Sequence, residues 1–500
     1  MQFNTISFGI FFTIVFCIYY FFRPTWRWAV LLASSIFFYA QLNAPQLIVA
    51  LVLVTLISYS IGRILSKLPA DSDKRKMFLW LGILLNLAVL AFIRYLPMLV
   101  ESLPALPFQW FSLPTLIVSV GVSFYVFQAI SYLIDIYFEK QPAEIHLGYF
   151  SLYISFFPKL LQGPIERASN LLPQLHKPAP LSDEIIRSAL LLFAWGLFKK
   201  VVIADRLALL VGAVYDHLPK FTGISLWLAT FLFALQIYCD FSGYTDMAIG
   251  VARLLGINLS INFNKPYLAT SIADFWRRWH ISFSTWIFDY IFKPLQMRLR
   301  NWKTWANPIA LLVTFFLSGI WHGASWGFIV WGLLHGSYMA AYALLEPYEK
   351  KFLLRFKLVN STTVKIIKTG ITFLLVCFAW IFFRAKTLGE GWYVVSHLFS
   401  GLDMFQQILQ RAIHGLPITN QGLGLQESFT FGIPIVDHVF AVIGLLVLSA
   451  VELPINLAKT RLGIAFQKHA AFRWLVYWLL TMSILAFGST VQTEFVYFRF

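Results

Sequence analysis

The sequence predicts an all-α, polytopic membrane protein, and composition is the first reason. Of its 500 residues, 59% are hydrophobic and 12% are charged, and the mean hydropathy is +0.71. Soluble domains carry about 25% charged residues, so this chain has too little polar surface to coat soluble globules of its mass. The second reason is a series of apolar runs close to the ~20 residues that a spanning helix needs. Each run must form a helix or a helix fragment, because unpaired backbone amides are too costly in lipid.

The predicted spans follow one another along most of the chain, and we expect roughly ten to twelve of them. Residues 6–22 form a spanning helix rather than an export signal, because no basic residue precedes them and no small-residue cleavage site follows. Asn43-Ala44-Pro45 divides the next run, residues 28–62, into two segments. The remaining spans are expected at residues 77–93, 115–134, 190–215 (interrupted by charge), 221–239, 306–345 (two crossings), 370–383, 436–451 and 474–491. We expect residues 1–500 to form one membrane unit, with the motif-bearing core at about residues 115–345.

The charge balance predicts the orientation and excludes several classes of protein. The chain has 39 Lys and Arg against 23 Asp and Glu, a net charge of +16, which in a polytopic protein reflects basic cytoplasmic loops. Residues 63–76 and 350–368 are such loops, which places the amino terminus and residues 97–114 outside. Residues 388–431 are expected to form an external loop. The surroundings are therefore the lipid bilayer, and no nucleic-acid partner is expected. The three cysteines are too scattered for a disulfide framework or a zinc site: Cys17, Cys239 and Cys377.

Ionisable residues among the apolar ones are the candidates for function, because each costs about 2.5–3.5 kcal/mol to insert. Lys159, Asp240 and Asp246 are expected to support a site. The two aspartates are six positions apart, so they do not share a helical face as an i, i+4 pair does. We expect each to pair with Lys or Arg elsewhere in the bundle. No H-E-x-x-H or Walker A motif is present, so we expect neither a metal site nor a bound cofactor.

His322 is the sharpest anomaly, because it lies in a run, residues 304–345, without any Asp, Glu, Lys or Arg. One interpretation is a neutral imidazole that a backbone carbonyl satisfies between packed helices. The other is a catalytic base, since histidine exchanges protons near neutral pH. Gly319 and Gly323 favour the second interpretation because they allow close backbone approach or a helix break. Trp321 and Trp326 could then wall a cavity around the imidazole.

His280 has basic and aromatic neighbours that allow two interpretations. Arg277 and Arg278 precede it, and Trp276 and Trp279 flank the two arginines. The segment could be an interfacial amphipathic helix with an aromatic belt and basic residues at lipid headgroups. It could equally form a cytoplasm-side pocket in which the arginines meet the phosphates of an anionic donor. The two interpretations are compatible. A further histidine, His335, is a weaker candidate and is more consistent with a structural role.

Four stretches together resemble the membrane-bound O-acyltransferase family, in its bacterial, alginate O-acetyltransferase-like branch. Two of them, the arginine-tryptophan-histidine and tryptophan-histidine-glycine stretches, carry most of the resemblance. The four are residues 156–165, Gln236 to Asp246, Asp274 to Ser282 and Ser318 to Gly323.

The resemblance implies a ring-like helical fold with re-entrant or broken helices around a central cavity. It implies that His322 is the catalytic base and that His280 supports it. It also implies an acyl donor, acetyl-CoA or another acyl-CoA or acyl-carrier thioester, and a polysaccharide acceptor at the cell surface. A periplasmic or extracellular acetyltransferase partner and a bacterial cytoplasmic (inner) membrane location follow from the same resemblance. The alternative is a transporter or flippase that moves a lipid-linked sugar or acyl donor without chemistry.

Overall fold

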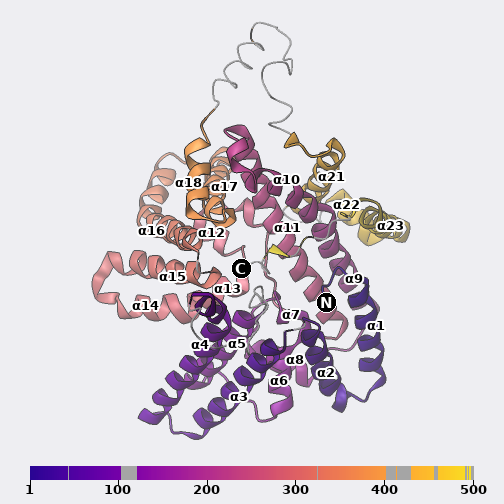
Figure 1. Ribbon diagram of the computed structural model, residues 1–500, viewed down its shortest axis with the longest axis vertical. Helices are drawn as coiled ribbons and strands as arrows, with labels where there is room; N and C mark the ends of the chain where they lie inside the picture. The colour runs from indigo at the N-terminus through magenta and orange to yellow at the C-terminus, as the bar shows by residue number, and fades with distance from the viewer. Residues whose placement is uncertain are drawn as a thin grey trace. The chain divides into compact units, whose positions relative to one another are not determined.

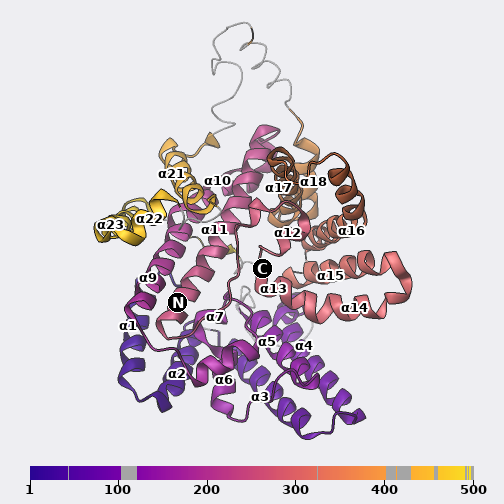
Figure 2. The same cartoon turned by 180° about the vertical axis from the view of Figure 1, so that it is seen from behind.

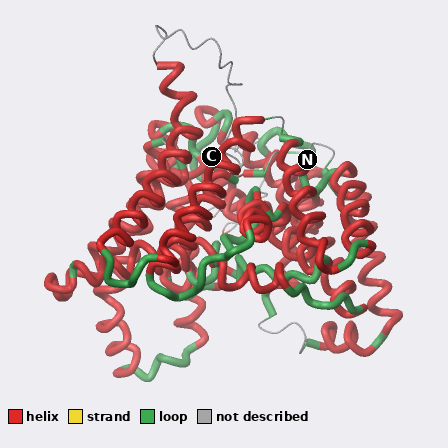
Figure 3. Tube along the Cα trace, turned by 90° about the horizontal axis from the view of Figure 1, so that it is seen from below, coloured by secondary structure: helices red, strands yellow, loops and turns green. Residues whose placement is uncertain are grey.

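The computed structural model describes residues 1–42, 44–102, 121–323, 325–400, 413, 430–454, 460–489, 493 and 495–496. The described residues form helices joined by loops, and none of them lies in a strand (Figure 3). The Cα trace divides into two compact units. Unit 1 comprises residues 1–197, 243–261 and 494–500, and unit 2 comprises residues 198–242 and 262–493.

Unit 1 holds the amino-terminal helices. Within it, α3, α4 and α5 pack side by side, as both views show (Figures 1 and 2). The amino-terminal helix is tied to the end of α11 because the hydroxyl of Tyr19 donates to the carbonyl of Leu255 over 3.0 Å. Its helices are α1 (Ile6–Phe21), α2 (Arg27–Ala40), α3 (Pro45–Lys67), α4 (Asp73–Ser102), α5 (Val122–Tyr137), α6 (Leu147–Ser155), α7 (Phe157–Leu160), α8 (Ala168–His176) and most of α9 (Asp183–Phe198).

Unit 2 holds the segments that carry both candidate histidines. In it, α15 and α16 form a tightly packed hairpin, with α14 beside α15 (Figure 1). Its helices are α10 (Asp205–Tyr215), most of α11 (Ile224–Leu254), α12 (Ile272–Trp276), α13 (Ile281–Ile287), α14 (Lys293–Arg298), α15 (Ala306–His322), α16 (Trp326–Arg355), α17 (Thr362–Arg384), α18 (Leu388–His397), α21 (Ile435–Glu452), α22 (Arg461–Lys468) and α23 (Ala470–Phe487). Two π-helices continue α9 and α13, at Lys199–Ala204 and Phe288–Phe292.

The helical spans agree with the sequence prediction in position. Among the described residues, eight helices are long and apolar enough to cross a membrane, and two shorter apolar helices, α1 and α5, accompany them. The predicted break at Asn43-Ala44-Pro45 separates α2 from α3, which has Pro45 as its first residue, where a proline needs no amide hydrogen. The predicted double crossing at residues 306–345 is the hairpin of α15 and α16. The chain is therefore a multi-pass, all-α membrane protein.

The interruption predicted within residues 190–215 is a π-helix at Lys199–Ala204, between α9 and α10. One predicted boundary was wrong, and charge was the reason. The span expected to end at Cys239 continues as α11 to Leu254, because Asp240 is neutralised by Lys200 and need not leave the bundle. Of the long loop expected at residues 388–431, Leu388–His397 is the helix α18. Most of the remainder, and the expected external segment from residue 103 onward, lie outside the described residues.

Candidate active site

His322 is the last residue of α15, and the predicted helix break follows it directly. Gly323 is extended, with φ 166° and ψ 168°, and α16 begins at Trp326. Gly319 supplies the close approach, because a Cβ there would lie 2.5 Å from the carbonyl oxygen of Phe328 in α16. The two backbones can therefore touch one turn before His322, and this contact fixes where the end of α15 lies against α16.

The imidazole of His322 lies among aromatic rings and is 4% exposed. The ring centroids lie 4.5 Å from Trp321, 4.8 Å from Trp331 and 5.2 Å from Phe383. Trp331 and Phe383 are both buried, whereas Trp321 is half-buried. Trp321 is thus the most exposed of these three aromatic residues.

Phe283 connects the two candidate histidines. Its ring stacks on Trp321 with centroids 4.3 Å apart and an interplanar angle of 22°. The same ring lies 5.2 Å from His280 and 6.3 Å from His322. The structure therefore brings His280 and His322 to one stacked aromatic pair, although 41 residues separate them in sequence.

His280 lies in the break between α12 and α13, outside the eight candidate spans. It is 1% exposed, and burial lowers its pKa to about 3. Its Nδ1 lies 3.1 Å from Oδ1 of Asn262, and its ring packs edge-on against Phe241 at 4.8 Å. The imidazole is therefore neutral at physiological pH and held on two sides.

The two arginines before His280 differ in their surroundings. Arg278 is half-buried and pairs with Asp274, Nε to Oδ1 at 3.0 Å. Arg277 is exposed and has no ion pair with any described residue. Arg277 is therefore the one of the two whose guanidinium is open to an incoming anion.

The tryptophans of this segment are core residues, so the interfacial-belt interpretation was wrong for them. Trp276 is 6% exposed and Trp279 is 1% exposed. The indole Nε1 of Trp276 donates to Nδ1 of His335 over 3.2 Å, which gives that histidine a structural partner. The buried rings of Trp276 and Trp279 anchor this segment in the core, and with it the backbone that carries His280.

Asp240 has the cationic partner that the sequence predicted. Lys200 lies 2.8 Å from both Asp240 and Asp205, and all three side chains are at most 2% exposed. Thr493 joins this group through its carbonyl, which accepts from Lys200 over 2.9 Å, and through its hydroxyl, which bonds Asp205. The buried charge cluster lies in unit 2, and Phe241, the residue after Asp240, contacts His280.

The other two supporting candidates lie in unit 1. Lys159 is 1% exposed and donates to the side-chain oxygen of Gln128 and, over 3.2 Å, to the carbonyl of Ile154. Burial lowers the pKa of Lys159 to about 7. Asp246 is half-buried in α11, beside Gly196.

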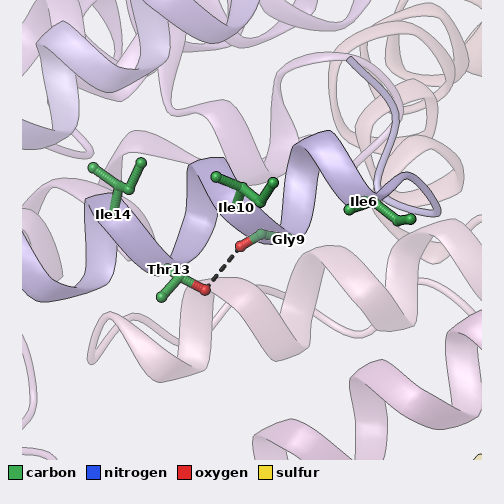
Figure 4. Close-up of a pocket in the computed structure, with 5 residues that line it drawn as sticks. All are labelled: Ile6, Gly9, Ile10, Thr13 and Ile14. Carbon is green, nitrogen blue, oxygen red and sulfur yellow. Dashed lines mark hydrogen bonds between the residues drawn. The ribbon is translucent and has the colours of Figure 1, made fainter.

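Two further features are the predicted cavity residue Trp326, in unit 2, and a surface groove in unit 1. Trp326 is 68% exposed and makes no ring contact with His322 in the described part of the chain. The groove lies on α1 in unit 1 and is lined by Ile6, Gly9, Ile10, Thr13 and Ile14, with Thr13 donating to the carbonyl of Gly9 (Figure 4). Its exposed isoleucines form a face suited to lipid. Within the described ranges, no group of three or more His, Cys, Asp and Glu side chains is arranged to hold a metal ion.

Sequence reasoning missed three residues that the structure places at the site. Asn262 and Phe283 contact His280, and Lys200 was seen only as a charge that interrupts a helix. Asn262 lies between the second and third of the four motif stretches, so nothing in the sequence marked it. Phe283 had no signal, because an aromatic residue is ordinary in a sequence with 50 phenylalanines.

Comparison with known proteins gives the family. The model of the MBOAT, membrane-bound O-acyltransferase family matches residues 139–389. The chain is 34% identical to "Probable alginate O-acetylase AlgI" of Azotobacter vinelandii, over 79% of this chain and 77% of the relative. It is 32% identical to the protein of the same name in Pseudomonas putida, over 97% and 96%. It is 34% identical to "Peptidoglycan O-acetyltransferase" of Helicobacter pylori, over 72% and 71%. With both histidines of the expected motifs on one aromatic pair and this similarity over most of its length, the chain belongs to the membrane-bound O-acyltransferase family and is an O-acyltransferase.

Proposed function

We propose that this enzyme takes an acetyl group from a cytoplasmic thioester, acetyl-CoA, and passes it across a bacterial cytoplasmic membrane for O-acetylation of a cell-surface polysaccharide. The observation that carries the proposal is the placement of His280 and His322 against the same stacked pair, Phe283 and Trp321. The names of the relatives, which are an alginate O-acetylase and a peptidoglycan O-acetyltransferase, support a polysaccharide acceptor.

In the proposed reaction, His322 acts as the general base. Its imidazole takes the proton of an acceptor hydroxyl while the oxygen attacks the carbonyl carbon of the thioester. The carbon–sulfur bond then breaks, the thiolate leaves, and the proton passes from the imidazolium to that sulfur. A thioester is activated enough for this step without ATP or a metal ion. General-base help of this kind is worth roughly 10²–10⁴ in rate.

The course of α15 supports access of the acceptor from outside. Lys293, Arg298, Arg300 and Lys303 are exposed before α15 begins, and basic residues mark the cytoplasmic side. His322 ends this 17-residue helix, about 25 Å further along at 1.5 Å per residue. The hydrocarbon core is about 30 Å thick, so the imidazole lies toward the far side of it. The half-buried Trp321 is the ring that we propose moves when a substrate enters.

Arg277 is the proposed contact for the phosphates of the donor. Its guanidinium is exposed and close in sequence to His280, and arginine binds phosphate through two parallel hydrogen bonds. Arg278 contributes less to binding of the phosphates, because its Nε already donates a hydrogen bond to Asp274. A periplasmic or extracellular acetyltransferase that receives the acetyl group remains part of the proposal.

Two experiments test the proposal, one with purified protein and one with intact cells. In detergent, release of free thiol from acetyl-CoA, with a sugar acceptor present, should depend on the protein, and Arg277→Ala should raise KM for acetyl-CoA about tenfold. Arg300→Ala is the matched control, an exposed arginine of the same unit, and should leave KM unchanged.

In cells, deletion of the gene should remove ester-linked acetyl groups from the surface polysaccharide, as measured by mass spectrometry. Re-expression of the wild-type protein should restore them. Unchanged acetylation in the deletion strain, or no turnover of acetyl-CoA by the purified protein, would reject the proposed function. Transport of an intact lipid-linked sugar without ester formation would instead support the transporter alternative.

A further inference from the structure

His280 adopts a backbone conformation that ordinary residues avoid. Its φ is 43° and its ψ is 54°, in the left-handed region, where a non-glycine residue persists only when its surroundings fix it. Two backbone hydrogen bonds to the segment at Asn262 supply that fixation. The amide of Ile281 donates to the carbonyl of Asn262 over 2.8 Å, and the amide of Asn264 donates to the carbonyl of Arg278 over 2.9 Å.

The side chain of Asn262 is oriented by Ser282. Its Oδ1 accepts from the backbone amide of Ser282 over 3.2 Å and from the hydroxyl of Ser282 over 2.9 Å. A backbone amide can only donate, so the atom that faces it must be the oxygen of the carboxamide and not the nitrogen. Asn262 is 1% exposed, so water does not compete for these bonds.

The oriented oxygen dictates which nitrogen of His280 carries the proton. Nδ1 lies 3.1 Å from the same Oδ1, and an amide oxygen can only accept. A proton on Nδ1 makes this contact a hydrogen bond, whereas a proton on Nε2 would set two lone pairs against each other. A neutral imidazole carries one proton, so protonation at Nδ1 leaves the lone pair on Nε2.

We propose that Asn262 is a positioning residue that holds His280 as its Nδ1–H tautomer, with Nε2 as the proton-accepting atom. The assignment makes Nε2 of His280 a hydrogen-bond acceptor toward a bound substrate, so this atom cannot donate to the substrate carbonyl. This consequence for the reaction rests on the proposed function. The tautomer itself does not, because it follows from contacts within the chain.

The direct test measures the tautomer in the unmodified protein. The full-length protein, labelled with ¹⁵N at histidine, is studied by solid-state NMR in lipid vesicles at pH 7.5 without substrate. His280→Asn identifies the signals of His280 by their loss. We expect Nδ1 of His280 to be protonated and Nε2 to be bare. A protonated Nε2 with a bare Nδ1 would overturn the assignment.

Variants then test whether the tautomer matters for transfer. Asn262→Ala should abolish the preference for Nδ1–H and lower kcat about 100-fold, with KM for acetyl-CoA within about twofold. Asn262→Asp keeps an accepting oxygen at the same place, so it should restore protonation at Nδ1 and most of kcat. Asn264→Ala, an exposed asparagine in the same segment, should match the wild type in both measurements.

The possible results separate the two proposals. A wild-type kcat in Asn262→Ala, or no rescue by Asn262→Asp, would overturn the positioning role. If neither the wild type nor any variant turns over acetyl-CoA, the proposed function fails. The NMR measurement still decides the tautomer in that case. If Asn262→Ala does not fold, the wild-type spectrum and Asn262→Asp decide it.

Discussion

Phe283 stacks on Trp321 with ring centroids 4.3 Å apart, and this pair joins α13 to the end of α15. Both candidate histidines contact the pair. An aromatic pair of this geometry adds about 0.5–1.5 kcal/mol to the burial of its rings. The stacking therefore sets how far apart the two imidazoles lie.

Phe283→Leu should disturb this spacing while keeping an apolar side chain. We expect a loss of roughly 100-fold in acetyl transfer, because small displacements of catalytic groups have effects of that size. The measurement is kcat with acetyl-CoA in detergent. Phe288→Leu is the control, because Phe288 is 45% exposed, and it should retain wild-type kcat. Equal kcat in both variants would show that the stacked pair does not position the histidines.

The close contact at Gly319 also fixes the position of His322. A Cβ at Gly319 would meet the carbonyl oxygen of Phe328 at 2.5 Å, so Gly319→Ala should force α15 and α16 apart and reduce both stability and transfer. Gly370→Ala is the matched control, because no atom of the described residues lies within 4 Å of a Cβ there. Replacing a glycine inside the helix should stabilise that protein by up to about 1 kcal/mol. The thermal midpoint in detergent measures the stability of both variants. A higher midpoint for Gly319→Ala than for the wild type would contradict the close contact.

The buried charge cluster should matter far more to stability than a half-exposed ion pair of similar length. Asp240→Ala leaves Lys200 buried with one fewer carboxylate, and breaking a buried pair costs about 3–5 kcal/mol. Asp289→Ala breaks the Lys293 pair, 2.9 Å long and half exposed, which contributes about 0–1 kcal/mol. We expect the first variant to unfold at a clearly lower temperature than the second. Equal midpoints would mean that water reaches Lys200.

The sequence predicted the helical class and most spans, and it singled out the two histidines that the structure brings to one aromatic pair. It could not predict the contacts between distant segments. Asp240 was expected to pair with a basic residue, yet nothing in the sequence named Lys200, 40 positions away. The helix continued past Asp240 because that pairing removed the charge that seemed to end it. Trp276 and Trp279 resembled an interfacial belt, since tryptophan suits both a core and a membrane interface. Only the folded structure shows that these two tryptophans belong to the core.

Histidine protonation should make the stability of the fold depend on pH. Burial lowers the pKa of His280 to about 3 in the folded protein, against ~6.5 in an unfolded chain. The unfolded state therefore binds more protons between these values, so this contribution is fully present above pH ~6.5 and is lost as the pH falls toward 3. The loss approaches about 1.4 kcal/mol per pH unit for this one group.

Thermal midpoints at pH 7.5, 6.5 and 5.5 check this dependence. His280→Asn should reduce it, because its amide can donate to Asn262 as Nδ1 does and cannot titrate. His217→Asn, a change at an exposed histidine, should keep the wild-type dependence. An identical pH response in His280→Asn and the wild type would show that His280 is not the group responsible.

The most direct test of the account is a single-turnover measurement of acetyl transfer by His322→Gln, with acetyl-CoA labelled in its acetyl group. The glutamine fills similar space but cannot take a proton from a hydroxyl at neutral pH. We predict a loss of at least 100-fold in the rate of ester formation, with a monodisperse protein and an unchanged KM for acetyl-CoA. A rate within about twofold of the wild type would contradict the assignment of His322 as the base.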